Sequence, residues 1–172
     1  MRSSEFKMRV MPYSDRIYRM AFRLMGNREE AEDIVQEVYL KLWGLRKGLD
    51  KYDSIEALAI RITRNLCLDN LRRRKTKQNA LNSQADYQEN AYTETPDKNL
   101  ERKQEKELVL SLISALPEPQ RSLVHLRHIE EKEYDEIASM VNMNVNAIRV
   151  SISRARKQMR EILDKKYATW KA

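Results

Sequence analysis

The segment 134–160 constrains the fold more strongly than any other part of the chain. Apolar residues recur in it at steps of three and four, which is the period of a helix with one buried face. Asn142-Met143-Asn144 interrupts this period, and asparagine tolerates the left-handed backbone that a sharp turn often needs. The apolar positions are Ile137, Ala138 and Val141 before the turn and Val145, Ile148, Ile152, Ala155 and Met159 after it. We therefore predict two helices joined by a tight turn.

The outer face of the second predicted helix is polar and basic. It carries Asn146, Arg149, Ser153, Arg154, Arg156, Lys157 and Arg160. Arginine, asparagine and serine are residue types that bind phosphates and read base edges in a DNA groove. The segment therefore predicts a DNA-binding helix-turn-helix. The alternative is a surface helix whose basic face is only solvated.

The composition indicates an all-helical protein. The 172 residues include three glycines and four prolines, while 41% are apolar and 34% are charged. So few helix breakers, without several alternating β-strand patterns, favour helices throughout. The formal net charge of +7 favours a polyanionic partner. Charge alone does not separate DNA from RNA or from an acidic membrane surface.

The sequence gives no support for secretion or for a membrane span. Cys67 is the one cysteine, so no intrachain disulfide can form. The longest apolar runs are short, as in residues 57–60, whereas a membrane-spanning helix needs about 20 apolar residues. Residues 1–8 lack the apolar core of a secretory signal. We therefore expect a cytoplasmic protein.

The pattern divides the chain into two small helical domains, 1–76 and 100–172. In the first, helices are expected at 13–24, ending near Gly26, then from a cap at Asn27, and at 55–75, with a loop at 44–54. Residues 77–99 are polar, nearly free of aliphatic side chains, and predicted to be a flexible linker. In the second, a helix with Leu108, Val109, Leu112, Ile113 and Leu116 ends at Pro117-Glu118-Pro119, and another spans 119–129 before the helix-turn-helix.

A second basic element lies in the first domain. Its residues are Arg61, Arg64, Asn65, Arg72, Arg73, Arg74 and Lys75. Cations at the end of a helix complement the helix dipole, which is one explanation for the run 72–75. It does not explain Arg61 and Arg64, so we predict phosphate contacts. Asp69 is interpreted as an ion-pair partner of the neighbouring arginines.

No catalytic or metal-binding motif accompanies these elements. His125 and His128 are three residues apart, but no cysteine or carboxylate lies at the spacing of a metal site, so solvent-facing or capping histidines are expected. The sequence has no phosphate-binding loop and no paired catalytic carboxylates. We predict a protein that is not an enzyme and that has no metal, cofactor or small-molecule substrate.

Several motifs resemble extracytoplasmic-function sigma factors of the sigma-70 family. EDIVQEV at 32–38, ITRNL at 62–66, Asp69 and RRR at 72–74 are similar to the family's second domain. LP at 116–117 through Arg121, EIA at 136–138, AIR at 147–149 and RAR at 154–156 are similar to its fourth domain. The resemblance covers about residues 13–76 and 108–163, in the family's order.

The resemblance implies a subunit of bacterial RNA polymerase that recognises promoters and melts DNA. It implies that the first domain docks on the clamp helices of the largest polymerase subunit through Asp33, Gln36 and Glu37, and meets the minus-ten element through the basic residues from Arg61 to Lys75 named above. Asn65 then lies beside the melted strand, where an amide can hydrogen-bond a flipped base. Tyr52 lies in the loop that captures this base, either stacked on it or stabilising the turn.

The resemblance also assigns the minus-thirty-five element to the helix-turn-helix. The positions concerned are Asn144, Asn146, Ala147, Arg149, Val150, Ser153, Arg154 and Lys157. The chain departs from the family pattern at Asn146-Ala147, where many relatives have Gly-Thr, and at Ser151, where many have Arg. Implied partners are core RNA polymerase, including the flap of its second subunit, promoter DNA and an anti-sigma factor. The alternative is an operator-binding regulator that acts without polymerase.

Overall fold

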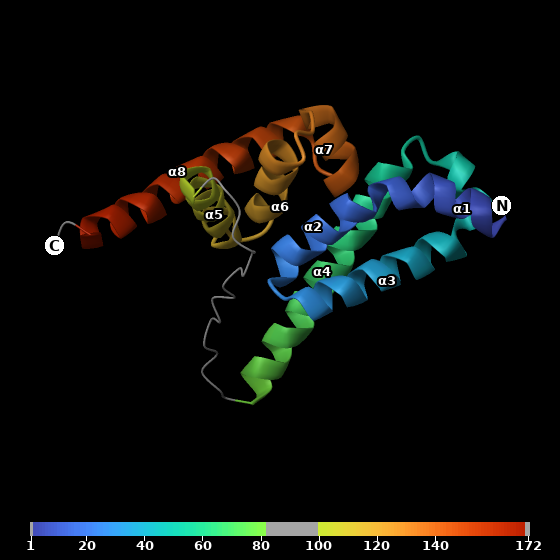
Figure 1. The fold of residues 1–172 in the computed structure, drawn as a ribbon, viewed down its shortest axis with the longest axis horizontal. Helices are drawn as coiled ribbons and strands as arrows, with labels where there is room; N and C mark the ends of the chain where they lie inside the picture. Colours follow the sequence, from blue (N-terminus) through green and yellow to red (C-terminus); the bar gives the residue numbers. More distant parts are fainter. Residues whose placement is uncertain (1, 82–99, 171–172) are drawn as a thin grey trace. The chain divides into compact units, whose positions relative to one another are not determined.

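The computed structural model describes residues 2–81 and 100–170. Every regular element in these two ranges is a helix, as the composition predicts (Figure 1). Contacts group the helices of the first range into one compact unit and most of those of the second range into another. Within the described ranges, no helix is long and apolar enough to cross a membrane.

The first unit is built on three helices that contact one another pairwise. These are α2 (Ser14–Met25), α3 (Arg28–Gly44) and α4 (Ile55–Ala80). The shorter elements are α1 (Ser3–Val10) and the 3₁₀ helices η1 (Met11–Tyr13) and η2 (Arg46–Lys51). Figure 1 shows α2, α3 and α4 side by side, with α1 near the far end of α3.

Local capping sets the boundaries of the helices in this unit. Gly26 ends α2 with a φ of 69°, a left-handed conformation that costs glycine little. The Asn27 side chain then accepts a hydrogen bond of 3.2 Å from the Glu30 N–H, which starts α3. Ser54 caps α4 in the same way, with 3.1 Å to the Ala57 N–H. The predicted stop at Gly26 and cap at Asn27 are confirmed.

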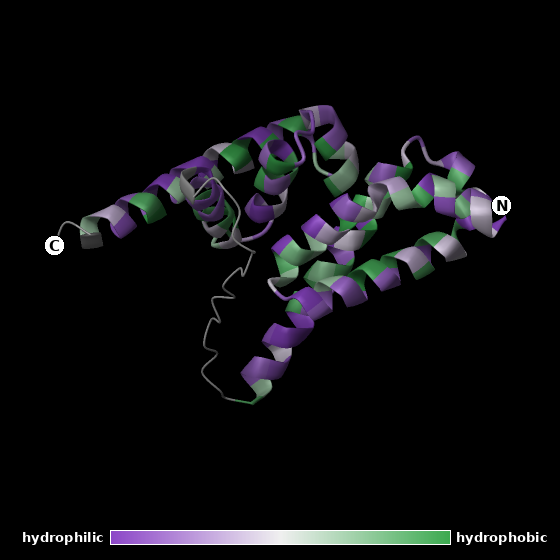
Figure 2. Ribbon diagram, viewed as in Figure 1, coloured by the Kyte–Doolittle hydropathy of each residue, from purple (hydrophilic) through white to green (hydrophobic). Residues whose placement is uncertain are grey.

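Buried apolar side chains of α2, α3 and α4 form the core of the first unit. Fully buried side chains include Ile17, Met20 and Leu24 of α2, Ile34, Val38 and Leu42 of α3, and Ala59, Ile60 and Cys67 of α4. Each large aliphatic side chain removed from water contributes roughly 1.5–3 kcal/mol. Hydrophilic and hydrophobic residues alternate along α3 in Figure 2, as this burial requires.

Two predictions about connecting segments in the first unit are wrong. The expected loop 44–54 contains η2, because Leu49 is fully buried and pulls this stretch into a tight turn. Helix α4 continues to Ala80, so residues 77–80 of the predicted linker are helical. No glycine or proline stands between Lys75 and Ala80, and extending an existing helix costs little. The remainder of the predicted linker, 82–99, lies outside the described residues.

The second unit contains five helical elements. They are α5 (Leu100–Ser114), α6 (Gln120–Val124), the π-helical turn η3 (His125–Ile129), α7 (Tyr134–Val141) and α8 (Val145–Trp170). Helices α5 and α6 both contact α8. The buried side chains of the second unit include Ile113, Leu116, Leu123, Leu126, Ile137, Ile148, Ile152 and Ala155. The first half of α8 therefore packs into the core of the second unit.

The structure adds to the sequence prediction at one place before the helix-turn-helix and differs from it at another. Val109, one of the apolar residues of the predicted helix that ends at Pro117, is 42% exposed. The expected helix 119–129 is regular only to Val124, because the Glu130 N–H reaches back five residues to the His125 carbonyl at 3.1 Å. This wider turn places Leu126 in the core while the chain reverses towards α7.

Two non-glycine residues, one in the turn on either side of α7, have left-handed backbones. Asn142 has a φ of 56° and makes the turn between α7 and α8, as predicted. Glu131 has a φ of 54° in the turn before α7, which the sequence did not indicate. Asparagine adopts this conformation far more readily than glutamate, so the second turn is the more strained.

Candidate nucleic-acid interface

The start of α8 is fixed by hydrogen bonds from the turn. Asn144 is its N-cap, and the Asn144 side-chain oxygen accepts a hydrogen bond of 2.8 Å from the Ala147 N–H. At the opposite end of α7, the Glu136 carboxylate accepts a hydrogen bond of 2.8 Å from the Glu133 N–H and caps the start of that helix. The Asn144 side chain thus has a structural function, and its predicted DNA contact stays a prediction.

The predicted basic face of α8 is exposed opposite a buried back. Ile148, Ile152 and Ala155 are at most 1% exposed. Around the rest of the helix the exposed residues are Asn146, Arg149, Val150, Ser153, Arg154, Arg156, Lys157 and Arg160, while Ala147 is half-buried. Figure 2 shows the same alternation of hydrophilic and hydrophobic residues along α8. A helix held from behind with cations in front can enter a DNA groove without repacking.

Aromatic stacking holds two arginines beside this face. The guanidinium carbons of Arg149 and Arg127 lie 5.0 Å and 4.9 Å from the centroid of the Tyr134 ring. Arg127 also donates a hydrogen bond of 2.9 Å to the Lys132 carbonyl. Sequence reasoning missed Arg127 and Tyr134 as neighbours of Arg149, because the three residues belong to different elements and no local spacing links them.

The second predicted interface lies along α4. Arg61 and Arg64 are half-buried, and Asn65 is exposed. The cations at 72–75 do not lie in the last turn, since α4 continues to Ala80 and Lys77 is the basic residue of that turn. The helix dipole acts mainly within the last turn, so it does not explain their number. Their phosphate contacts stay a prediction.

Two of the arginines at the end of α4 have acidic partners. Arg72 lies 3.3 Å from Asp69, which confirms the predicted ion pair. Arg74 pairs with Glu30 of α3 and is less exposed than Arg72. This pair ties α4 to the first turn of α3. Arg73 and Lys75 are also exposed. The four cations therefore differ, because Arg72 and Arg74 also form ion pairs within the unit.

Tyr52 lies where η2 ends, two residues before the cap of α4. Its N–H donates a hydrogen bond of 3.2 Å to the Leu49 carbonyl, and the residue is 41% exposed. Asp50 in the same turn pairs with Arg9 of α1 at 2.6 Å. The backbone of Tyr52 closes the turn while its ring remains accessible, so both predicted functions are compatible with its placement.

The predicted docking face on α3 is exposed. Asp33, Gln36 and Glu37 are all exposed, whereas the neighbouring Ile34 and Val38 are buried. Leu40, one turn further, is 71% exposed. With Met11, Trp43 and others, Leu40 and Gln36 line an open groove of about 480 Å³ between α1 and α3. Sequence reasoning found the carboxylates but missed Leu40, which lies three residues after Glu37 on the same exposed face and outside the period of the core.

Comparisons with known proteins match both units. Residues 10–77 match the family model of sigma-70 region 2, and residues 106–159 match that of sigma-70 region 4. The chain belongs to the extracytoplasmic-function sigma factors. It is 31% identical over 159 residues to the sigma factor SigE of Mycolicibacterium smegmatis, covering 91% of this chain and 60% of SigE. With SigW of Bacillus subtilis it shares 26% identity over 159 residues, covering 88% of this chain and 84% of SigW.

Solved sigma-factor structures have the same fold. The sigma factor RpoE of Bartonella quintana, crystallised with the anti-sigma factor NepR, superposes with a TM-score of 0.76 at 20% identity and covers 93% of this chain and 97% of that chain. CnrH, in complex with the cytosolic domain of CnrY, superposes with a TM-score of 0.65 at 20% identity and covers 95% of this chain and 90% of that chain. At this identity the likeness concerns the fold.

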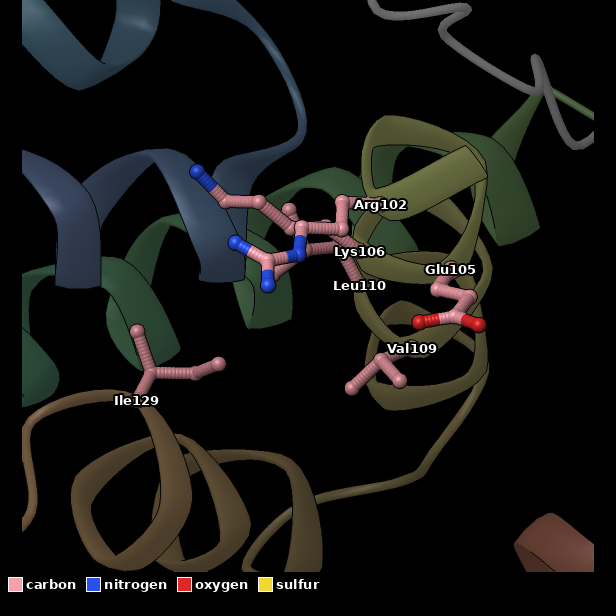
Figure 3. Close-up of a pocket in the computed structure, with 6 residues that line it drawn as sticks. All are labelled: Arg102, Glu105, Lys106, Val109, Leu110 and Ile129. Atoms are coloured by element: carbon pink, nitrogen blue, oxygen red, sulfur yellow. The ribbon is translucent and has the colours of Figure 1, made fainter. Parts of the chain in front are cut away.

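The second unit of this sigma factor carries an open groove on α5. It has a volume of about 410 Å³ and is lined by Arg102, Glu105, Lys106, Val109 and Leu110 of α5 and by Ile129 of η3. Figure 3 shows the side chains of Val109 and Ile129 on opposite sides of this groove, with Arg102 above the space between them in the view. The exposure of Val109 is explained by this position, because no neighbouring helix covers the groove among the described residues.

Of the two histidines predicted to be solvent-facing or capping, His128 is exposed as predicted and His125 is not. His125 is fully buried, and its Nε2 lies 3.3 Å from a Glu130 carboxylate oxygen. Residue His128 is exposed, yet the pKa of its imidazole is lowered, first by partial desolvation and then by the charges of Arg156 and Arg127. No group of three potential metal ligands occurs among the described residues.

Proposed function

We propose that this sigma factor binds core RNA polymerase, directs it to promoters and assists DNA melting. One observation carries the proposal: each unit presents its own basic helix, and the units match regions 2 and 4 of one family in order. Two independent contacts on one DNA give a higher effective affinity than either contact alone. The protein makes or breaks no bond. It acts in the cytoplasm, where its polymerase partner lies.

In the proposal, the second unit reads duplex DNA at the minus-thirty-five element. The exposed face of α8 presents Arg149, Ser153 and Arg154 from a helix whose other face is fully buried. A bidentate arginine–guanine contact discriminates against a wrong base by about 1–3 kcal/mol. The remaining cations bind phosphates, which fixes the register of the helix without reading sequence.

The first unit takes the minus-ten element in the proposal. Asn65 projects from α4 as an exposed amide among cations, which suits an unpaired base more than a duplex. The accessible ring of Tyr52 offers a stacking surface for that base. Binding energy released by a flipped base shifts the equilibrium from closed to open DNA. The cations at the end of α4 hold the phosphates nearby.

The partners follow from the same assignment. The exposed Asp33, Gln36 and Glu37 dock on the clamp helices of the largest polymerase subunit, and the second unit meets the flap of the second subunit. An anti-sigma factor is the proposed regulator, as in RpoE and CnrH, which were solved with such proteins. The alternative of an operator-binding regulator is disfavoured, because the first unit matches sigma-70 region 2 and not a sensor domain.

Run-off transcription with purified core polymerase tests the proposal. Genomic fragments are transcribed with core enzyme alone, with the full chain added, and with Asp33→Lys/Glu37→Lys. We expect discrete transcripts only with the wild-type chain, and loss of both transcripts and core binding with the charge reversal. Lys166→Ala, at an exposed position near the end of α8, is the matched control and should behave as wild type. Discrete transcripts from core enzyme alone, or none with the wild-type chain, would reject the proposal.

A further inference from the structure

Arg149 does not project from α8 as an isolated side chain. Its guanidinium carbon lies 5.0 Å from the centroid of the Tyr134 ring, within the range of a cation–π contact. Tyr134 is the first residue of α7, whereas Arg149 lies on the second turn of α8. The contact therefore crosses the turn of the helix-turn-helix and links the two helices outside their apolar core.

The Tyr134 ring is itself held by a second arginine. The guanidinium carbon of Arg127 lies 4.9 Å from the ring centroid, and further contacts hold this guanidinium in place. The Arg127 Nη1 atom donates to the Lys132 carbonyl at 2.9 Å and lies 3.4 Å from a Glu133 carboxylate oxygen. The left-handed backbone of Glu131 reverses the chain so that 127 and 134 meet. The ring is thus a half-buried platform with a defined orientation.

A platform of this kind matters because an exposed arginine has many rotamers. Recognition of a guanine by two parallel hydrogen bonds needs one orientation of the planar guanidinium, and ordering a free arginine costs side-chain entropy. A stacked guanidinium has part of this ordering completed before DNA arrives, which lowers the cost of binding. The ring leaves the edge of the guanidinium, with its N–H donors, free to meet a base.

We infer that Tyr134 is a positioning residue that aligns Arg149 for sequence-specific readout. The inference rests on the proposed function, since Arg149 is the residue that reads the base. Tyr134 acts through its ring and through Arg149, without a base contact of its own. It follows that Tyr134→Phe keeps the effect, that Tyr134→Leu loses it, and that Tyr134→Leu changes nothing once Arg149 is absent.

A double-mutant cycle with holoenzyme tests this inference. The probes are one promoter duplex obtained from the run-off experiment and the same duplex with its upstream element scrambled. The ratio of their dissociation constants measures discrimination. Tyr134→Leu should lower that ratio about two- to five-fold, the size of an exposed cation–π contact. Tyr134→Phe should remain within two-fold of wild type, and Tyr134→Leu should have no further effect in an Arg149→Ala background.

Other outcomes would overturn the inference. An equal loss from Tyr134→Leu with and without Arg149 would make the ring a scaffold or a direct DNA contact. A loss in Tyr134→Phe as large as in Tyr134→Leu would assign the effect to the hydroxyl group. Tighter matched binding in Tyr134→Leu would mean that the stack holds Arg149 away from DNA. If any of these outcomes occurred while the wild-type chain still directed selective transcription, the inference about Tyr134 would be wrong and the proposed function would stand.

A measurement on the free full chain protects the test from folding defects. Protons of Arg149 above an aromatic ring should show upfield ring-current shifts in NMR spectra. We expect these shifts in wild type and Tyr134→Phe, and their loss in Tyr134→Leu, with the amide spectrum of α8 otherwise preserved. Absence of the shifts in wild type would overturn the inference even if the leucine variant did not fold.

Discussion

The helices α4 and α8 carry the same kinds of side chains but use them differently. On α8 the exposed cations oppose a fully buried apolar back, and the fold of the unit rests on that back. On α4 two of the terminal arginines are paired, Arg72 with Asp69 and Arg74 with Glu30 of another helix. Arginines of α4 therefore contribute to the fold of their unit, whereas the exposed cations of α8 are separated from the core.

The number of cations on a helix does not by itself show how many of them are available to bind DNA. A count of cations assigns equal weight to α4 and α8, although part of the positive charge on α4 is already neutralised within the unit. What distinguishes α4 as a site is its exposed amide at Asn65. We therefore expect that replacing a paired arginine of α4 lowers the stability of the first unit. Replacing an exposed cation of α8 should mainly weaken DNA binding.

The largest expected effect is on the buried back of α8. Ile152→Ala should lower the free energy of unfolding of the second unit by about 2–5 kcal/mol, because Ile152 is 1% exposed and its removal leaves a cavity. Hydrogen exchange of α8 amides in increasing urea measures this loss. Ser153→Ala, at the adjacent exposed position, is the control and should leave exchange unchanged. Equal protection in both variants would contradict the proposed packing.

The next effect separates the exposed face from the buried one. Arg149→Ala should weaken holoenzyme binding to a matched promoter duplex by about 1–3 kcal/mol, whereas the loss of its contact with Tyr134 should cost the second unit at most about 1 kcal/mol of stability. Fluorescence anisotropy with matched and scrambled duplexes measures it. Lys166→Ala should change neither affinity beyond the salt-dependent contribution of one charge. If Arg149→Ala kept full affinity and discrimination, the predicted base contact would be wrong.

A smaller effect should distinguish Arg74 from Arg73 within α4. Arg74→Ala should destabilise the first unit by at most about 1 kcal/mol, because its pair with Glu30 is partly exposed and screened by solvent. Arg73→Ala, which removes an exposed neighbour of the same charge, should leave stability unchanged. Thermal unfolding at low and high salt measures the difference, which should shrink at high salt. A stability loss of equal size in both variants would contradict the structural function of Arg74.

The smallest effect concerns pH. Because the folded state lowers the pKa of His128 below its ordinary value near 6.5, folding opposes protonation of this group. The stability it contributes is present above the unfolded pKa and is lost as the pH falls below about 6.5. Wild type should therefore lose slightly more melting temperature between pH 7.5 and 5.5 than His128→Gln. An identical loss of melting temperature in both proteins would show that protonation of His128 does not contribute to the pH dependence of stability.

Features set by neighbouring residues were predictable from the sequence. The stop at Gly26, the cap at Asn27 and the left-handed turn at Asn142 each follow from a side chain acting on its own backbone. The buried stripe of α8 follows from helical periodicity in the same way. Apart from the half-buried Ala147, the predicted site residues on α8 and α3 are exposed for this reason as well, because a face opposite a core stripe must point outward.

Features that depend on distant residues were not predictable. His125 is buried because the π-helical turn rotates it inward, a change that no propensity signals. The pair of Arg74 with Glu30 and the stack of Arg127, Tyr134 and Arg149 join residues from different elements. Val109 fits the helical period of the core, yet it lies at an open groove because no partner helix covers it within the described residues.

The most direct test of the account compares Asn65→Ala with Arg149→Ala in the same holoenzyme. Duplex affinity at low temperature and permanganate reactivity of the melted strand at 37 °C are measured for both variants. The account predicts that Asn65→Ala binds the closed duplex as wild type but shows weaker permanganate reactivity. Arg149→Ala should bind more weakly yet open the promoter normally once bound. Identical defects in both variants, or wild-type opening by Asn65→Ala, would contradict the division between the two helices.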